Sequence, residues 1–182
     1  MATTTQINDL TALYTGYFDR APDPVGLQFW IKEIDGGRDF NTISADFAAS
    51  SEALALYPFL TTPDVSTPNT FVTSIYVNLF NRAPDAAGLT FWTDALKAGT
   101  VSNADMIEAI IKGAADSSTA TPPSFDKTTL DNKIEAGSFF VTTASNTPGF
   151  KYDAADAVDV LSGVTNDPAT LAAAKVKASA SL

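Results

Sequence analysis

Two Arg–Asp pairs in this chain have residue types and a spacing that could do chemistry. Arg20 precedes Asp23 by three residues, and Arg82 precedes Asp85 by the same interval. A guanidinium beside a carboxylate could clamp a sugar or a carboxylate ligand, or the two could pair with each other across a tight turn. The structural alternative is more common in proteins. A cation at a helix end complements the helix dipole, and an Asp at the next helix start caps free N–H groups. We therefore expect these residues to brace a corner between helices.

A second candidate is the acidic series Asp153, Asp156 and Asp159. The steps of three residues place these carboxylates broadly on one side of a helix. Oxygen ligands of this kind suit Ca²⁺, so the series is a weak candidate for a metal site. A solvated acidic helix face is the commoner outcome of such a pattern.

The aromatic and glycine residues near the Arg–Asp pairs also allow two interpretations. Trp30 and Trp92 could stack on sugar rings, but their helical spacing among Leu and Ile favours core positions. Gly26 and Gly88 lie one turn inside the helix that each Asp opens. A missing side chain there permits close approach of a neighbouring element.

The Arg–Asp pairs and the neighbouring Trp and Gly residues belong to one internal repeat. The segment from Tyr14 to Trp30 reads YTGYFDRAPDPVGLQFW, and the segment from Tyr76 to Trp92 reads YVNLFNRAPDAAGLTFW. The shared skeleton is Y-x-x-x-F-x-R-A-P-D-x-x-G-L-x-F-W at a constant offset of 62 residues. The register shifts by one after Gly99, so that Phe47 corresponds to Ile110. A duplicated unit is more typical of scaffolds and binding proteins than of small enzymes.

The apolar periodicity predicts an all-α protein, with three helices in each repeat and a C-terminal helical segment. Residues 61–68 and 117–124 are rich in Pro, Thr and Ser and predict linkers. The organisation expected is therefore repeat one at 1–60, repeat two at 68–117 and an extension at 125–182, all packed as one unit. The helices expected are 5–18, 24–35 and 41–56 in repeat one, 71–80, 86–98 and a helix capped at Ser102 or Asn103 through Ile111 in repeat two, and 126–143, 153–161 and 168–178 in the extension.

The composition argues against several functions. The 182 residues include no Cys and no His, which removes thiolate nucleophiles, Ser-His-Asp triads and the commonest metal ligand. The formal net charge of −10 disfavours nucleic acids and anionic membranes. No apolar stretch has transmembrane length. We expect no enzymatic activity, no nucleic-acid partner, no membrane insertion and no cofactor, unless Ca²⁺ binds.

The repeated corner resembles the bacterial module called domain of unknown function 4214. Its R-x-P-D-x-x-G-L-x-x-W corner is followed by a third helix with a Ser-x-Glu-like element, which Ser50-Ser51-Glu52 matches. Repeat two departs from this pattern with Gly113-Ala114-Ala115-Asp116. The resemblance covers residues 5–116 and implies a helical module of secreted surface-layer proteins and of calcium-binding proteins exported by type I systems. The Gly- and Asp-rich calcium nonapeptide of those proteins is absent.

These observations favour a secreted structural module that self-assembles into an extracellular surface layer or filament. Its partners would be copies of itself, with Ca²⁺ bridging acidic surfaces, and its terminal segments (1–6 and 176–182) would lie in contacts between subunits. The alternative is a glycan-binding module that anchors a surface protein to envelope polysaccharide. A helical linker like those of phycobilisomes is a third reading, which the acidic charge disfavours. No cleaved Sec-type leader is visible, so the cell surface and the cytoplasm are both open, and the resemblance favours the surface.

Overall fold

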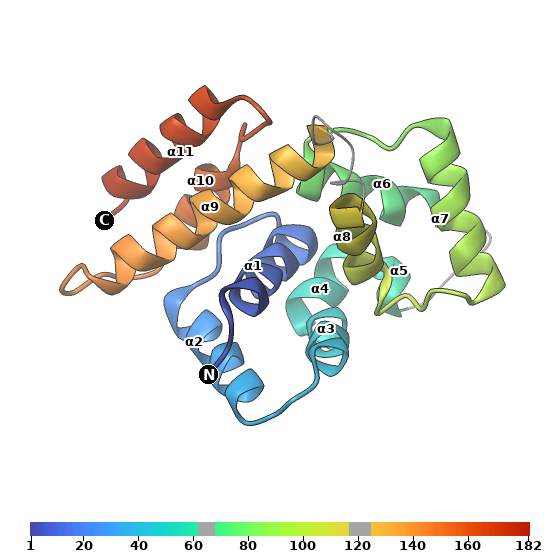
Figure 1. Cartoon of the computed structure of the whole chain (residues 1–182), viewed down its shortest axis with the longest axis horizontal. Coiled ribbons are helices and arrows are strands. Elements are labelled where there is room, and N and C mark those ends of the chain that lie inside the picture. The colour runs from blue at the N-terminus through green and yellow to red at the C-terminus, as the bar shows by residue number, and fades with distance from the viewer. Residues whose placement is uncertain (62–67, 117–124) are drawn as a thin grey trace.

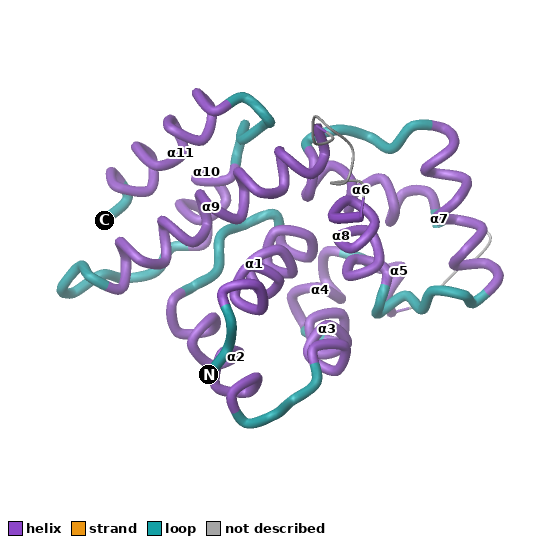
Figure 2. The backbone as a smooth tube through the Cα atoms, viewed as in Figure 1, coloured by secondary structure: helices purple, strands orange, loops and turns teal. Residues whose placement is uncertain are grey.

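The computed structural model describes residues 1–61, 68–116 and 125–182, and within these ranges the regular structure is all helix, with no strand (Figure 2). The predicted all-α class is confirmed. The two predicted linkers lie almost wholly outside the described residues. The helices are α1 (Thr4–Phe18), α2 (Pro24–Asp35), α3 (Phe40–Ala49), α4 (Ser51–Leu56), α5 (Pro58–Thr61), α6 (Asn69–Phe80), α7 (Ala86–Ala98), α8 (Met106–Asp116), α9 (Phe125–Ser145), α10 (Ala154–Leu161) and α11 (Pro168–Ala180).

The single helix expected over residues 41–56 is wrong, because the chain breaks at Ser50. Ser50 adopts an extended backbone, with φ −64° and ψ 148°, and its Oγ accepts a hydrogen bond from the Ala53 N–H at 3.1 Å. It thus ends α3 and caps α4. Tyr57 is also non-helical, with φ −125° and ψ 87°, because the ring of Pro58 disfavours the α conformation before it. Pro58 then opens the short helix α5.

The third helix of repeat two begins later than its predicted cap. The Oγ of Ser102 accepts from the Asp105 N–H at 3.1 Å, in a turn that precedes α8. Ser102 therefore organises the approach to the helix, which starts at Met106.

Both repeats leave their first helix through a left-handed residue. Asp19 after α1 has φ 49°, and Asn81 after α6 has φ 55°. Asp and Asn tolerate this conformation better than most residues, which explains their presence at equivalent positions. Each residue turns the chain into its Arg-Ala-Pro-Asp segment, so the corner geometry begins here.

The main core joins the two repeats. It contains buried side chains from both first helices and both third helices, among them Leu13, Tyr17, Ile75, Leu79 and Ile107. α1 packs against α6, and α8 packs against α1. The phenol of Tyr17 donates to the Ala104 carbonyl at 2.9 Å, which ties α1 to the segment before α8.

The C-terminal extension covers one side of the repeats (Figure 1). The long helix α9 contacts α1 and α6, and α10 and α11 pack on α9. A second apolar cluster forms there around Phe140, Val160 and Leu161, and Ala21 of the first repeat joins it. The backbone N–H of Ala21 donates to the Ala157 carbonyl at 3.0 Å.

Both chain ends make contacts within the same molecule. Thr3 and Gln6 form a reciprocal capping box at the start of α1. In α11, Ala174 and Ala178 are buried in the second cluster. The subunit contacts expected of these terminal segments stay a prediction, because the contacts that the structure shows for them lie within one molecule. Among the described residues, no helix is both long and apolar enough to cross a membrane.

Candidate binding site at the second corner

The two repeated segments form two corners with the same frame. The first corner comprises Tyr14, Arg20, Asp23, Gly26 and Trp30, and the second comprises Tyr76, Arg82, Asp85, Gly88 and Trp92. In each corner the Asp is the N-cap of the second helix, the position that the sequence assigns to it. Asp23 Oδ1 accepts from the Gly26 N–H at 2.6 Å, and Asp85 Oδ1 accepts from the Gly88 N–H at 2.7 Å.

The glycines give the Tyr hydroxyl and the Asp carboxylate access to the first turn of the helix. A Cβ at Gly26 would lie 2.4 Å from the Tyr14 hydroxyl and 2.6 Å from Asp23 Oδ2. At Gly88 the corresponding distances are 3.4 Å to the Tyr76 hydroxyl and 3.2 Å to Asp85 Oδ1. The close approach therefore involves the preceding helix's tyrosine, and the first corner is the tighter of the two.

The arginines do not pair with the aspartates of their own motifs, so the pairing that the spacing allowed is not formed; each arginine has another acidic partner. Arg20 donates to both oxygens of Glu52, at 3.0 and 2.9 Å, and to the Tyr152 hydroxyl at 2.7 Å. Its guanidinium also lies 5.2 Å from the Tyr14 ring centroid. Arg20 thus links the first corner to α4 and to the C-terminal extension, and Glu52 is the acidic residue of the Ser-x-Glu-like element.

Arg82 forms its ion pair with an acidic residue outside the two repeats. Its Nε and Nη2 donate to Asp126 at 2.6 and 2.5 Å, and its Nη1 donates to the Ala83 carbonyl at 2.9 Å. Asp126 lies in the first turn of α9, so repeat two obtains from the extension a partner that repeat one carries in α4. Asp126 was not a sequence candidate, because nothing in the repeat points to a residue 44 positions away.

The tryptophans are half-buried against the core, so the expectation of buried equivalent sites is met only in part. In the first corner the Phe47 ring fills the centre. Its centroid lies 5.0 Å from Tyr14, 5.6 Å from Phe18 and 5.1 Å from Trp30. These three ring contacts make the first corner a packed part of the core.

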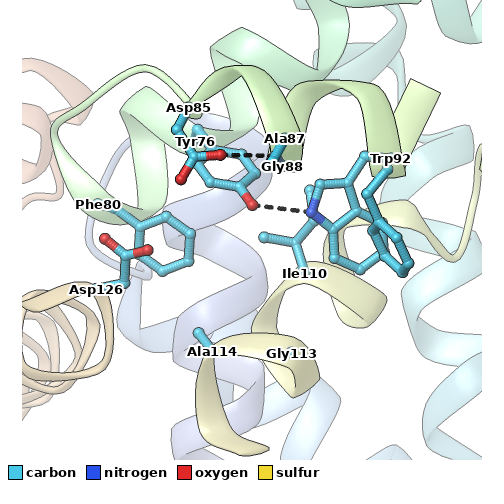
Figure 3. Close-up of a pocket in the computed structure, with 11 residues that line it drawn as sticks. Tyr76, Phe80, Asp85, Ala87, Gly88, Trp92, Ile110, Gly113, Ala114 and Asp126 are labelled. Atoms are coloured by element: carbon cyan, nitrogen blue, oxygen red, sulfur yellow. Dashed lines mark hydrogen bonds between the residues drawn. The ribbon is translucent and has the colours of Figure 1, made fainter. Parts of the chain in front are cut away.

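The second corner is an open pocket of about 500 Å³ (Figure 3). Ile110 occupies the position that corresponds to Phe47, and it supplies no ring to fill the space. Gly113 and Ala114 of α8 add little bulk to the wall. The pocket is lined by Tyr76, Phe80, Asp85, Ala87, Gly88, Phe91, Trp92, Ile110, Gly113, Ala114 and Asp126.

Aromatic rings and a few polar groups define the chemistry of this pocket. Phe91 is 63% exposed, and its ring meets Trp92 edge-on at 4.8 Å. The Trp92 Nε1–H donates to the Tyr76 hydroxyl at 2.9 Å. Burial raises the pKa of Tyr76, so its phenol stays protonated and keeps one O–H to donate. Asp85 Oδ2 accepts no hydrogen bond from a described residue.

The arrangement can bind a flat or apolar group and make directed hydrogen bonds at its edge. The exposed Phe91 ring and the half-buried Trp92 offer stacking, Tyr76 offers a donor, and Asp85 offers an acceptor. The sequence skeleton already contained Phe91, through the F-W pair shared with Phe29, but the open space follows from the missing ring at Ile110.

The acidic series in the extension does not gather as a metal site. Asp153 is the N-cap of α10 and accepts from the Ala155 N–H at 2.7 Å, while Asp159 accepts from Lys177 at 3.1 Å. Asp156 lies in the first turn of α10. Within the described ranges, no three acidic side chains are grouped so that they could hold a metal ion.

Fold and site together define an all-helical protein with a duplicated helix–corner–helix unit. Residues 61–116 match the family model described as Domain of unknown function (DUF4214), which is the family that the repeated motif predicts. The match holds the second corner and spans less than half of the chain. No curated protein and no solved structure is similar enough to the chain to count as a match.

Proposed function

We propose that this chain is a non-enzymatic structural module that self-assembles into an extracellular layer or filament. The observation that carries the proposal is the contrast between the two corners. The same frame is closed in repeat one by the Phe47 ring and left open in repeat two. An open pocket lined by aromatic side chains, with the exposed Phe91 ring at its surface, is the kind of surface that another macromolecule covers.

The proposed assembly must overcome the charge of the chain. A formal net charge of −10 makes copies repel one another. Apolar burial at the second corner and local charge pairing oppose that repulsion, and bridging Ca²⁺ would reduce it. Screening at roughly 0.1 M salt limits the repulsion to about 10 Å. Export by a type I route and a place at the cell surface belong to the same proposal and rest on the family resemblance.

The test is light scattering and electron microscopy of the purified chain over a range of concentrations, with and without millimolar calcium. We expect particle mass to grow with protein concentration, more strongly with added salt or calcium, and filaments or sheets in the micrographs. Ile110→Phe, which supplies the missing ring, should reduce this growth. A chain that stays strictly monomeric under all of these conditions would contradict the proposal.

A second candidate function is glycan binding that anchors a surface protein to envelope polysaccharide. The specific observation in its favour is that the Tyr76 hydroxyl, the exposed Phe91 ring and an Asp85 oxygen that accepts no hydrogen bond from the described residues all line one pocket. Sugars are bound by such combinations of a stacking face and hydroxyl-directed polar groups.

The glycan candidate can be tested by co-sedimentation with envelope polysaccharide. Phe91→Ala should lower retention, whereas Phe29→Ala removes the equivalent exposed ring from the first corner and serves as the matched control. Equal retention of both variants, or no retention of the unmodified chain, would argue against a sugar site at the second corner.

A further inference from the structure

Helix α2 carries an exposed apolar strip that ends in a cation. Val25 is 81% exposed, Phe29 is 51% exposed, and Lys32 is also exposed. They lie at i, i+4 and i+7, so they share one face of the helix. Lys32 has no ion pair within the described part of the chain. We call these three residues the α2 strip.

The first corner shows what closes a corner of this type. There a Phe ring from α3 packs among a Tyr, a Phe and a Trp at centroid distances of 5.0 to 5.6 Å. The second corner retains the equivalent Tyr76, Phe80 and Trp92, but Ile110 stands in place of the ring. A phenyl group is therefore the natural occupant of the open space.

We propose that the α2 strip of one copy docks into the second corner of another copy, with the Phe29 ring entering the pocket. This inference rests on the proposed self-assembly and names the two surfaces that meet. Val25 would lie against the pocket rim, where the facing wall includes the small residues Ala87 and Gly88 of α7.

Local charges favour this pairing in a protein whose overall charge opposes it. The pocket is bordered by the carboxylates of Asp85 and Asp126, and Arg82 neutralises the second of them. One unneutralised carboxylate therefore remains, and Lys32 carries the complementary charge one turn beyond Phe29. Such complementarity orients a contact and rejects like-charged alternatives.

The proposed contact joins two different surfaces of the same chain. α2 lies to the left of α1, whereas α7 forms the right-hand edge of the molecule (Figure 1). A contact between unlike patches is heterologous. After the first contact one copy still has its free pocket and the other still has its free strip. Repetition then produces a ring or an open filament rather than a closed two-fold dimer.

Two variants and their mixture test this arrangement by sedimentation velocity. Ile110→Phe fills the pocket and keeps the strip, and the double variant Phe29→Ala, Lys32→Glu removes the strip and keeps the pocket. Each should remain monomeric alone, with association weakened about 10-fold or more, as expected for loss of a central aromatic anchor. Mixed together they should form a one-to-one dimer, because one intact strip meets one intact pocket.

Circular dichroism of each variant confirms that it folds, and Phe91→Ala gives a second pocket variant at an exposed position. If the unmodified chain assembles but the variants assemble equally well, this contact is overturned while the proposed function stands. A mixture that stays monomeric beside an assembling unmodified chain also overturns the contact. A strictly monomeric unmodified chain overturns the proposed function and the contact together.

Discussion

The two glycines of the repeated motif occupy equivalent positions, but neighbouring atoms approach them to different distances. Gly26 faces a Tyr14 hydroxyl that cannot retreat easily, because the Tyr14 ring is buried and packs edge-on against Phe47. Asp23 is equally constrained, since its Oδ1 caps α2. Gly88 has more room, with its nearest obstacle at 3.2 Å. The second corner therefore has a glycine at this position although its packing would accept a Cβ with only a small shift.

This contrast predicts that Gly26→Ala destabilises the protein by about 1–3 kcal/mol, the usual cost of overpacking. Gly88→Ala should change stability by roughly 1 kcal/mol or less, because Ala favours the helix and a slight shift relieves the contact. Chemical denaturation of both variants gives the free energies of unfolding. Equal losses at the two sites would show that the tighter geometry of the first corner has no energetic consequence.

At the scale of elements, the extension is held to the repeats through a buried cation. Lys133 of α9 is 1% exposed, and its Nζ donates to the Asn78 carbonyl in the last turn of α6 at 2.6 Å. Asp19 Oδ1 lies 3.7 Å away. The carbonyls of a last helical turn lack partners within the helix, and a cation there complements the helix dipole. Lys133 thus joins α9 to the ends of both first helices.

Lys133→Met should destabilise the protein by about 1–3 kcal/mol, because the apolar chain keeps the shape but leaves a buried carbonyl without its donor. Lys175→Met is the control, because Lys175 of α11 also forms an ion pair with α9, but at a more exposed position within the extension. The Lys175 pair with Glu135 is partly exposed, with 34% and 57% of the two side chains accessible, and should contribute about 0–1 kcal/mol. Denaturation curves of the two variants are the measurement, and a loss in Lys175→Met as large as in Lys133→Met would refute the special role of the buried cation.

Most helices can be predicted from the sequence, because their apolar periodicity and caps are local signals. The Asp23 and Asp85 caps depend on residues three positions away, so the motif itself indicates them. The break at Ser50 was missed because an apolar 3.6-residue pattern continues on both sides of it. The ion pairs of Arg20 and Arg82 were missed for a different reason. Their partners, Glu52 and Asp126, are brought in by tertiary packing that no local spacing encodes.

The open pocket at the second corner could be predicted from the sequence only in part. The sequence aligns Phe47 with Ile110 and so records the loss of a ring. It does not show that the ring occupied the centre of the corner, because that follows only from the positions of Tyr14, Phe18 and Trp30 around Phe47. A substitution inside a repeat becomes a candidate site only when the structure shows what the original residue filled.

At the scale of the whole molecule, the buried tyrosines make the stability of the fold depend on pH. The chain has five tyrosines, and burial is the largest cause of a raised pKa at each of them. The pKa values of Tyr57 and Tyr152 rise to about 12. Tyr57 joins the repeats, since its hydroxyl accepts from Asn78 at 2.7 Å, and Tyr152 joins the extension to Arg20. Ionising these groups therefore opposes the contacts between all three segments.

The sign of the effect follows from proton binding. An unfolded tyrosine loses its proton near pH 10, whereas these folded tyrosines keep theirs until about pH 12, so the unfolded state binds fewer protons in that window. Stability is then present in full below about pH 10 and falls as the pH rises. Lys133 acts in the opposite direction, because burial lowers its pKa and the folded state releases that proton first. Five tyrosines outweigh one lysine, so the net slope should be negative.

We therefore predict that tyrosinate absorbance rises late and cooperatively in the native protein, together with the loss of helical circular dichroism. In denaturant the same five side chains should titrate independently near pH 10. Tyr57→Phe should unfold at a higher pH than its free energy of unfolding at neutral pH would suggest. The reason is that it lacks one phenol whose ionisation favours the unfolded state at high pH. A native titration that overlays the denatured one, with helix content unchanged, would mean that the phenols are not buried at the joints between repeats and extension.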